Sequence, residues 1–112
     1  MIIEERIGDV IVEIVNVERA SVKEADELKT KLIDAIDDGY KKIIIDLSEC
    51  DFVDSSFLGV LVNSLKKVVK LEGDLKLVGF RPAVRAMFEL TRLFRVFESF
   101  SNLQEAVKSY TH

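Results

Sequence analysis

The sequence predicts an α/β fold in which a mixed, mostly parallel sheet of about five strands packs with four helices, in the order ββαβαβαβα. Two β-branched runs at the start, separated by Gly8-Asp9, are typical of an antiparallel hairpin. Short apolar runs then alternate with segments whose apolar residues recur every three or four positions, which indicates strands connected by helices. Because the 112 residues include one Pro and no linker-like stretch, we expect a single domain over residues 1–112.

The opening hairpin is predicted from residues that favour extended backbone. The first strand contains Ile2, Ile3 and Ile7, and the second extends from Val10 to Val15. Their β-branched side chains fit a pleated, half-buried surface. We therefore expect an antiparallel pair before the first helix.

The first helix is expected to begin at Ser21, because Ser21 and Glu24 fit a capping box. In such a box the serine hydroxyl accepts from the third helical amide, and the glutamate reaches back to the serine amide. Gly39 suits a left-handed C-terminal cap, so the helix should end near Asp38. Its buried stripe is expected to comprise Ala25, Leu28, Leu32, Ala35 and Ile36.

The middle of the chain predicts a buried strand followed by a long helix. The run from Ile43 to Ile45, together with Leu47, is typical of a central strand that is covered on both faces. From Ser55 to about Leu71 the apolar positions keep helical spacing, and Gly73 closes the segment.

The last third predicts another strand, a third helix, an edge strand and a terminal helix. The buried strand runs from Leu75 to Val78, and Pro82 lies in the first turn of the third helix, where a missing amide proton costs little. Val96-Phe97 is expected to form a short edge strand. A second capping box from Ser101 to Gln104 should open the terminal helix.

Composition argues against several classes of function. Sixteen Lys and Arg against twenty Asp and Glu give a net charge of −4, whereas nucleic-acid binding requires a basic surplus. The single Cys50 and the single His112 are too few for a disulfide or a zinc site and suit the reducing cytoplasm. The longest charge-free run in the apolar middle, Ser55 to Leu65, is far shorter than the roughly 18 residues of a transmembrane helix.

Acidic residues gather in the middle of the chain. Residues 43–65 include four acids and no Lys or Arg, namely Asp46, Glu49, Asp51 and Asp54. Glu49, Asp51 and Asp54 lie in the loop between the predicted strand and the second long helix, or at the end of this loop. Such loops, at the carboxyl ends of parallel strands, are where open α/β sheets usually present functional sites. A purely structural interpretation is that Asp54 is present in this loop because it caps the helix, without any role in a functional site.

Two parts of the chain carry a family resemblance. The first consists of DLS (46–48) and FVDSSFLGVL (52–61), and it resembles the signature of the STAS family, the domain shared by sulfate transporters and anti-sigma factor antagonists. The second part, from Leu75 to Phe97, is similar to the second half of small bacterial anti-sigma factor antagonists. The resemblance thus covers nearly the whole chain and implies a STAS-like domain.

This resemblance implies a phosphorylation-controlled regulator of transcription with Ser55 as the phosphoacceptor. In the family, the unphosphorylated antagonist binds a serine kinase anti-sigma factor and frees the sigma factor, and a metal-dependent serine phosphatase resets the phosphorylated form. No catalytic residue, cofactor or metal is expected. The motif and partner-binding residues implied are Asp46, Asp51, Asp54, Ser56 and Phe57.

A phosphate on Ser55 would change local charge more than structure. It adds about −1.5 to −2 charge, beside Asp54 and near Asp51 and Glu49, with no cation close by in the sequence. Repulsion and desolvation would oppose docking, while amides at the helix N-terminus could stabilise the phosphate. We therefore expect an altered surface and an unaltered fold.

Several positions depart from the family pattern or have a plain structural interpretation. Phe57 and Arg92 stand where the antagonists usually have Gly, and residues 16–21 lack the usual Gly and Asp. The ring of Phe57 either fills an apolar gap or projects beside the phosphoacceptor as a partner anchor. Gly59 is expected to permit close packing of its helix on the sheet, and Cys50 to be a buried small hydrophobe.

Two other classes of function compete with this hypothesis. One is a STAS scaffold or regulatory subunit of a stress-signalling or transporter assembly that binds without phosphorylation. The other is an enzyme or phospho-aspartate receiver, but no His lies near the acidic loop and no Gly-rich phosphate cradle follows a strand.

Overall fold

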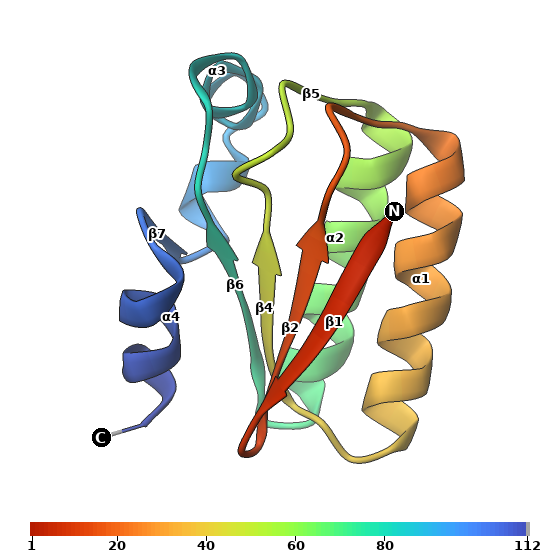
Figure 1. Cartoon of the computed structure of the whole chain (residues 1–112), viewed down its shortest axis with the longest axis vertical. Helices are drawn as coiled ribbons and strands as arrows, with labels where there is room; N and C mark the ends of the chain where they lie inside the picture. Colours follow the sequence, from red (N-terminus) through yellow and green to blue (C-terminus); the bar gives the residue numbers. More distant parts are fainter. Residues whose placement is uncertain (112) are drawn as a thin grey trace.

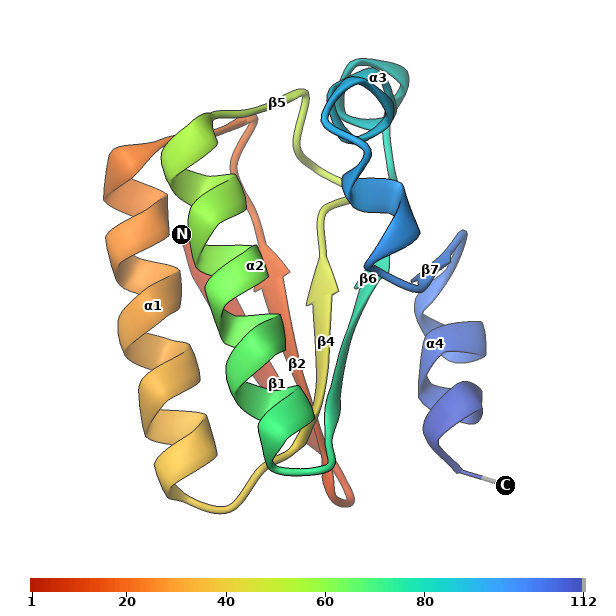
Figure 2. The ribbon, with the colours of Figure 1, turned by 180° about the vertical axis from the view of Figure 1, so that it is seen from behind.

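A computed structural model describes residues 1–111 and shows a five-stranded sheet with helices on both faces (Figures 1 and 2). The strand order is β1-β2-β4-β6-β7. Antiparallel pairing joins β1 (Ile2–Ile7) to β2 (Val10–Val15), and Gly8 turns between them with φ +62°. The other pairs, from β2 through β4 (Lys42–Asp46) and β6 (Asp74–Val78) to β7 (Ser99–Phe100), are parallel. The predicted mixed, mostly parallel sheet is confirmed.

Two long helices cover one face of this sheet and a short helix covers the other. Figure 2 shows α1 (Val22–Asp37) and α2 (Ser55–Lys70) side by side on one face, with α4 (Leu103–Tyr110) on the opposite face. The short α3 (Pro82–Leu90) lies beyond the carboxyl end of β6 (Figure 1). The strands between the helix layers are therefore buried on both faces, as the continuous apolar run at Ile43 to Ile45 predicts.

The predicted helix starts are largely correct. At α1 the Ser21 amide donates to Glu24 Oε1 at 3.0 Å, which is one half of the expected capping box. At α4 the cap is Asn102 and not Ser101, because Asn102 Oδ1 accepts from the Glu105 amide at 2.9 Å. Arg92 itself takes the left-handed conformation, with φ 60°, in the turn where a glycine would be easier.

The predicted edge strand at Val96-Phe97 is wrong. A 3₁₀ turn, η1 (Leu93–Arg95), precedes these residues, and the edge strand β7 lies a few residues later. Phe97 is buried and packs edge-on against Phe88, with ring centroids 6.1 Å apart. Burial of this ring, and not strand pairing, explains the apolar pair. The edge strand that pairs with β6 is β7, and the Gly79 amide extends this pairing by donating to Phe100 O at 3.0 Å.

Candidate functional site

The acidic loop lies between β4 and α2 at the carboxyl edge of the sheet. Two short parallel strands, β3 (Arg19–Ala20) and β5 (Phe52–Val53), form a second sheet. This sheet includes the end of the loop that leads into α2. The Asp51 amide donates to Glu18 O at 2.7 Å, and the Asp54 amide donates to Ala20 O at 3.0 Å. The two loops that precede α1 and α2 therefore form one surface.

Ser55, the predicted phosphoacceptor, is exposed at the first position of α2. Asp54 directly before it is the N-cap, and its Oδ1 accepts from the Phe57 amide at 2.9 Å. The carboxylate thus has a structural role and holds the start of the helix. Ser56 is also exposed, so two adjacent hydroxyls are accessible at this helix end.

Phe57 lies inside the protein and not beside Ser55. Its side chain is 0% exposed and belongs to the core cluster between the sheet and helices α1 and α2. Of the two roles considered for Phe57, filling an apolar gap is therefore correct and partner anchoring is wrong. The ring does not cover Ser55, so the aromatic residue leaves the hydroxyl accessible.

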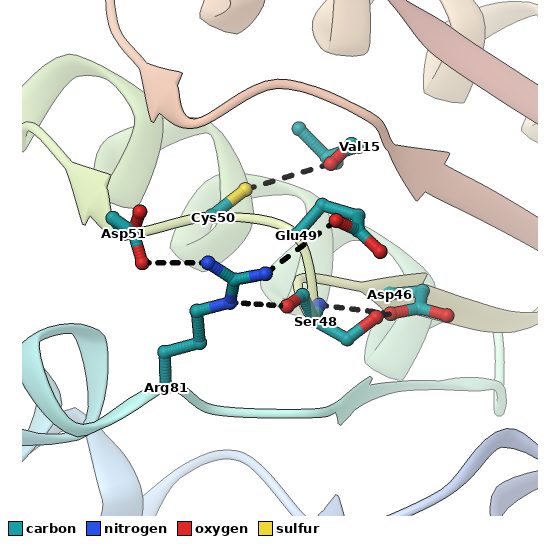
Figure 3. Close-up of polar contacts among 7 residues, drawn as sticks. All are labelled: Val15, Asp46, Ser48, Glu49, Cys50, Asp51 and Arg81. Carbon is teal, nitrogen blue, oxygen red and sulfur yellow. Dashed lines mark hydrogen bonds and ion pairs between the residues drawn. The ribbon is translucent and has the colours of Figure 1, made fainter.

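Arg81 is a residue of the candidate site that the sequence analysis did not identify. Its guanidinium donates to Ser48 O at 2.8 Å through Nε and to Asp51 Oδ1 at 2.9 Å through Nη1, while Nη2 lies 3.5 Å from Glu49 Oε2 (Figure 3). The acidic loop has no cation close by in the sequence, but the fold brings Arg81 to it. These acids also raise the pKa of Arg81 above its usual value, so it stays charged.

Strand adjacency brings this arginine to the acidic loop. Because β4 and β6 are parallel neighbours, the loops that follow them meet at the same sheet edge. Gly79, with φ +75°, allows the close approach, since a Cβ there would lie 2.6 Å from Ser48 Cβ. Arg81 follows β6 by three residues. A prediction that β4 and β6 pair would have indicated that Arg81 lies near the acidic loop.

Asp46 and Cys50 have structural roles in the same loop. Asp46 Oδ1 accepts from the Ser48 amide at 2.9 Å and from the Ser48 hydroxyl at 2.6 Å, which fixes the turn after β4. The Cys50 thiol is buried and donates to Val15 O at 3.6 Å (Figure 3). Burial raises the pKa of Cys50 to about 11, so the thiol stays protonated and unreactive. The predicted buried hydrophobe is confirmed.

A groove of about 340 Å³ between α1 and α2 extends from the site along the helices. Ser55 and Ser56 line it, as does Gly59 one turn further along α2. A Cβ on Gly59 would meet nothing within 4 Å, so the predicted close packing of this glycine on the sheet is wrong. The glycine faces the groove.

Within residues 1–111, no group of three His, Cys, Asp or Glu side chains is placed to hold a metal ion. None of the helices in that part of the chain is long and apolar enough to span a membrane.

Comparison with known proteins points to one family. The family model described as the STAS domain matches residues 4–106. The chain is 26% identical over 86 residues to BtrV of Bordetella bronchiseptica, which is named as an anti-sigma factor antagonist; this alignment spans 77% of the chain and 74% of BtrV. It is 36% identical over 70 residues to a similarly named protein of Thermotoga maritima, an alignment that spans 62% of each chain.

Solved structures agree with this sequence comparison. The crystal structure of an anti-sigma factor antagonist from Thermotoga maritima superposes with a TM-score of 0.89 at 28% identity, and the match covers 96% of the chain and 92% of that structure. The unphosphorylated form of SpoIIAA has the same fold, with a TM-score of 0.86 at 20% identity over 98% of the chain and 96% of SpoIIAA.

Proposed function

Because the chain belongs to the STAS domain family, we propose that it is an anti-sigma factor antagonist controlled by phosphorylation of Ser55. The unphosphorylated form binds a serine kinase anti-sigma factor and releases a sigma factor for transcription, and a metal-dependent serine phosphatase restores this form. The observation that carries the proposal is the exposed Ser55 hydroxyl at the start of α2, beside the acidic loop. In this proposal residues 1–112 act as one cytoplasmic domain by binding and not by catalysis.

The helix cap supports a phosphorylation that leaves the fold intact. Asp54 keeps the first turn of α2 in place through its bond to the Phe57 amide, and this bond does not involve Ser55 Oγ. Amides at a helix N-terminus stabilise an added phosphate. The core beneath remains closed because Phe57 is buried. Phosphorylation would therefore alter the surface at Ser55 and leave the packing unchanged.

The negative charge of the phosphate on Ser55 is what switches partner binding off in this proposal. A phosphate adds about −1.5 to −2 charge, which takes the net charge of the chain from −4 to about −6. Arg81 does not remove this effect, because its guanidinium is already engaged by Asp51 and Glu49. A partner surface that fits the neutral hydroxyl would have to desolvate the phosphate and meet its repulsion from Asp54 and Asp51.

One observation favours an alternative in which the chain binds a partner without phosphorylation, as a scaffold or regulatory subunit. The loop at residues 16–21, which departs from the family pattern, lies directly against Asp51 to Asp54. A changed docking surface of this kind would accept a different partner. Under this alternative, a charge placed at Ser55 has little effect on binding.

Phosphorylation is tested first, by intact mass after incubation with a candidate serine kinase anti-sigma factor and ATP. The wild type and Ser56→Ala should each gain one phosphate, and Ser55→Ala should gain none. A wild type that gains no phosphate contradicts the proposal, and a phosphate that persists in Ser55→Ala shows that the acceptor is another residue.

Binding is tested next, with a pair of variants that differ in charge and hardly in size. Isothermal titration should show that Ser55→Asp binds the anti-sigma factor more weakly than Ser55→Asn, which should resemble the wild type. Equal affinities for the two variants would refute the charge switch and favour the phosphorylation-independent alternative.

A further inference from the structure

The groove between α1 and α2 has the length and spacing of a helix-binding surface. On α2 its lining residues recur along one helix face, from Ser56 through Val60 and Asn63 to Lys67. Between Ser55 and Lys67 the helix rises about 18 Å, or slightly more than three turns. On the opposite side, α1 lines a shorter part of the groove, from Lys29 to Ile36. A segment of about twelve residues in helical conformation would fill this length.

The lining of the groove is apolar at its base and positively charged at its rim. Leu32 and Val60 form part of the base, and Ile33 remains 37% exposed at the rim. Lys29 and Lys67 are the charged lining residues, and no acid is among them. Neither lysine forms an ion pair within residues 1–111. In a chain of net charge −4, this surface favours an apolar face flanked by acids.

Gly59 provides an independent observation about the same surface. A glycine inside a helix is less favourable than alanine by about 1 kcal/mol, yet no contact within the chain requires one here, because a Cβ at Gly59 would meet nothing within 4 Å. The absence of a side chain leaves the base of the groove open. Close approach of a second backbone at this point would explain the residue.

We infer that this groove binds an amphipathic helix of the anti-sigma factor, with apolar side chains over Gly59 and Val60 and acidic side chains at Lys29 and Lys67. The inference rests on the proposed function, since it identifies the contact that Ser55 controls. Ser55 lies at one end of the groove. A helix that docks over this end of the groove would have to desolvate the phosphate, so modification and docking are coupled.

Two matched pairs of variants test the groove by isothermal titration with the anti-sigma factor. Gly59→Leu fills the groove, while Thr30→Leu adds the same side chain at an exposed position of α1 outside it. Thermal unfolding should show that both variants remain folded. Gly59→Leu should weaken binding by about tenfold or more, and Thr30→Leu by less than about threefold.

The second matched pair consists of two double variants that change the net charge of the chain by the same amount. Lys29→Glu with Lys67→Glu reverses the groove lysines, and Lys23→Glu with Lys70→Glu reverses exposed lysines of the same two helices outside it. Only the groove pair should weaken binding by about tenfold or more. If both groove variants bind like wild type while Ser55→Asp binds weakly, the inference is wrong and the proposed function stands. A wild type that binds no anti-sigma factor overturns both.

The identity of the occupant is tested by photocrosslinking from a small diazirine amino acid at Asn63, which is exposed and lines the groove. Crosslinks should map to residues three or four apart in one helical segment of the anti-sigma factor, with acids near its ends. Crosslinks to a loop of the anti-sigma factor, or to a second copy of this chain, overturn the inference of a helical occupant.

Discussion

Replacement of the buried carboxyl of Glu13 by an amide should remove a large pH dependence of stability. Glu13 lies on β2 with 0% exposure, and neither of its carboxyl oxygens has a hydrogen-bond partner among residues 1–111. The strand register places Glu4 directly opposite it. Burial, and after it the proximity of Glu4, raise the pKa of Glu13 to about 8, although Lys31 and Arg6 act in the opposite direction.

The sign and size of the effect follow from this pKa. The unperturbed value is 4.5 and the folded value is about 8, so the folded state holds the proton more tightly than the unfolded state. The contribution of Glu13 to stability is fully present below pH 4.5 and is lost as the pH rises to about 8. Each pKa unit corresponds to 1.36 kcal/mol, so the loss reaches about 3 kcal/mol at pH 7 and at most about 5 kcal/mol at pH 9.

Urea unfolding of Glu13→Gln and wild type between pH 4 and pH 9 measures this contribution. The two proteins should differ little at pH 4, and the variant should become more stable by several kcal/mol above pH 8 because glutamine cannot ionise. Glu5→Gln, an exposed position on β1, serves as the control and should follow the wild type. Parallel pH profiles for Glu13→Gln and wild type would refute the reasoning.

Substitutions at four further positions test the packing and backbone arguments by chemical denaturation. Phe57→Ala should cost about 3 to 5 kcal/mol, because it empties a fully buried ring position; a cost below about 1 kcal/mol would place the ring at the surface. The two glycines should respond in opposite directions: Gly79→Ala destabilises by about 1 to 3 kcal/mol through its positive φ and the contact with Ser48, whereas Gly59→Ala stabilises by about 1 kcal/mol. Asp54→Ala should cost about 1 kcal/mol through loss of the α2 cap, and Asp54→Asn should restore most of it.

Most of the secondary structure could be predicted from residues close together in the chain. The spacing of apolar residues located α1, α2 and β4, and the Gly8 turn separated the first two strands. The prediction failed at Val96-Phe97, where a short apolar pair is compatible with either an edge strand or a buried turn. Only the contact between Phe97 and Phe88, which lie nine positions apart, decides between them.

The candidate site was predicted in part. The exposed Ser55 and its cap Asp54 are adjacent in sequence, so their relation follows from the start of a helix. Arg81 lies 30 residues from Asp51, and no local pattern connects them. Their ion pair depends on the parallel neighbours β4 and β6, which bring two distant loops together.

The sequence by itself determined the α/β class, the N-terminal caps of α1 and α2 and the position of the acidic loop, because periodicity and capping depend on neighbours within a few residues. Tertiary structure decided that Phe57 points inward, that Arg81 joins the acidic loop and that Gly59 opens onto a groove. These outcomes depend on which strands and helices become neighbours, and the environment of a side chain is set by packing between segments that are distant along the chain.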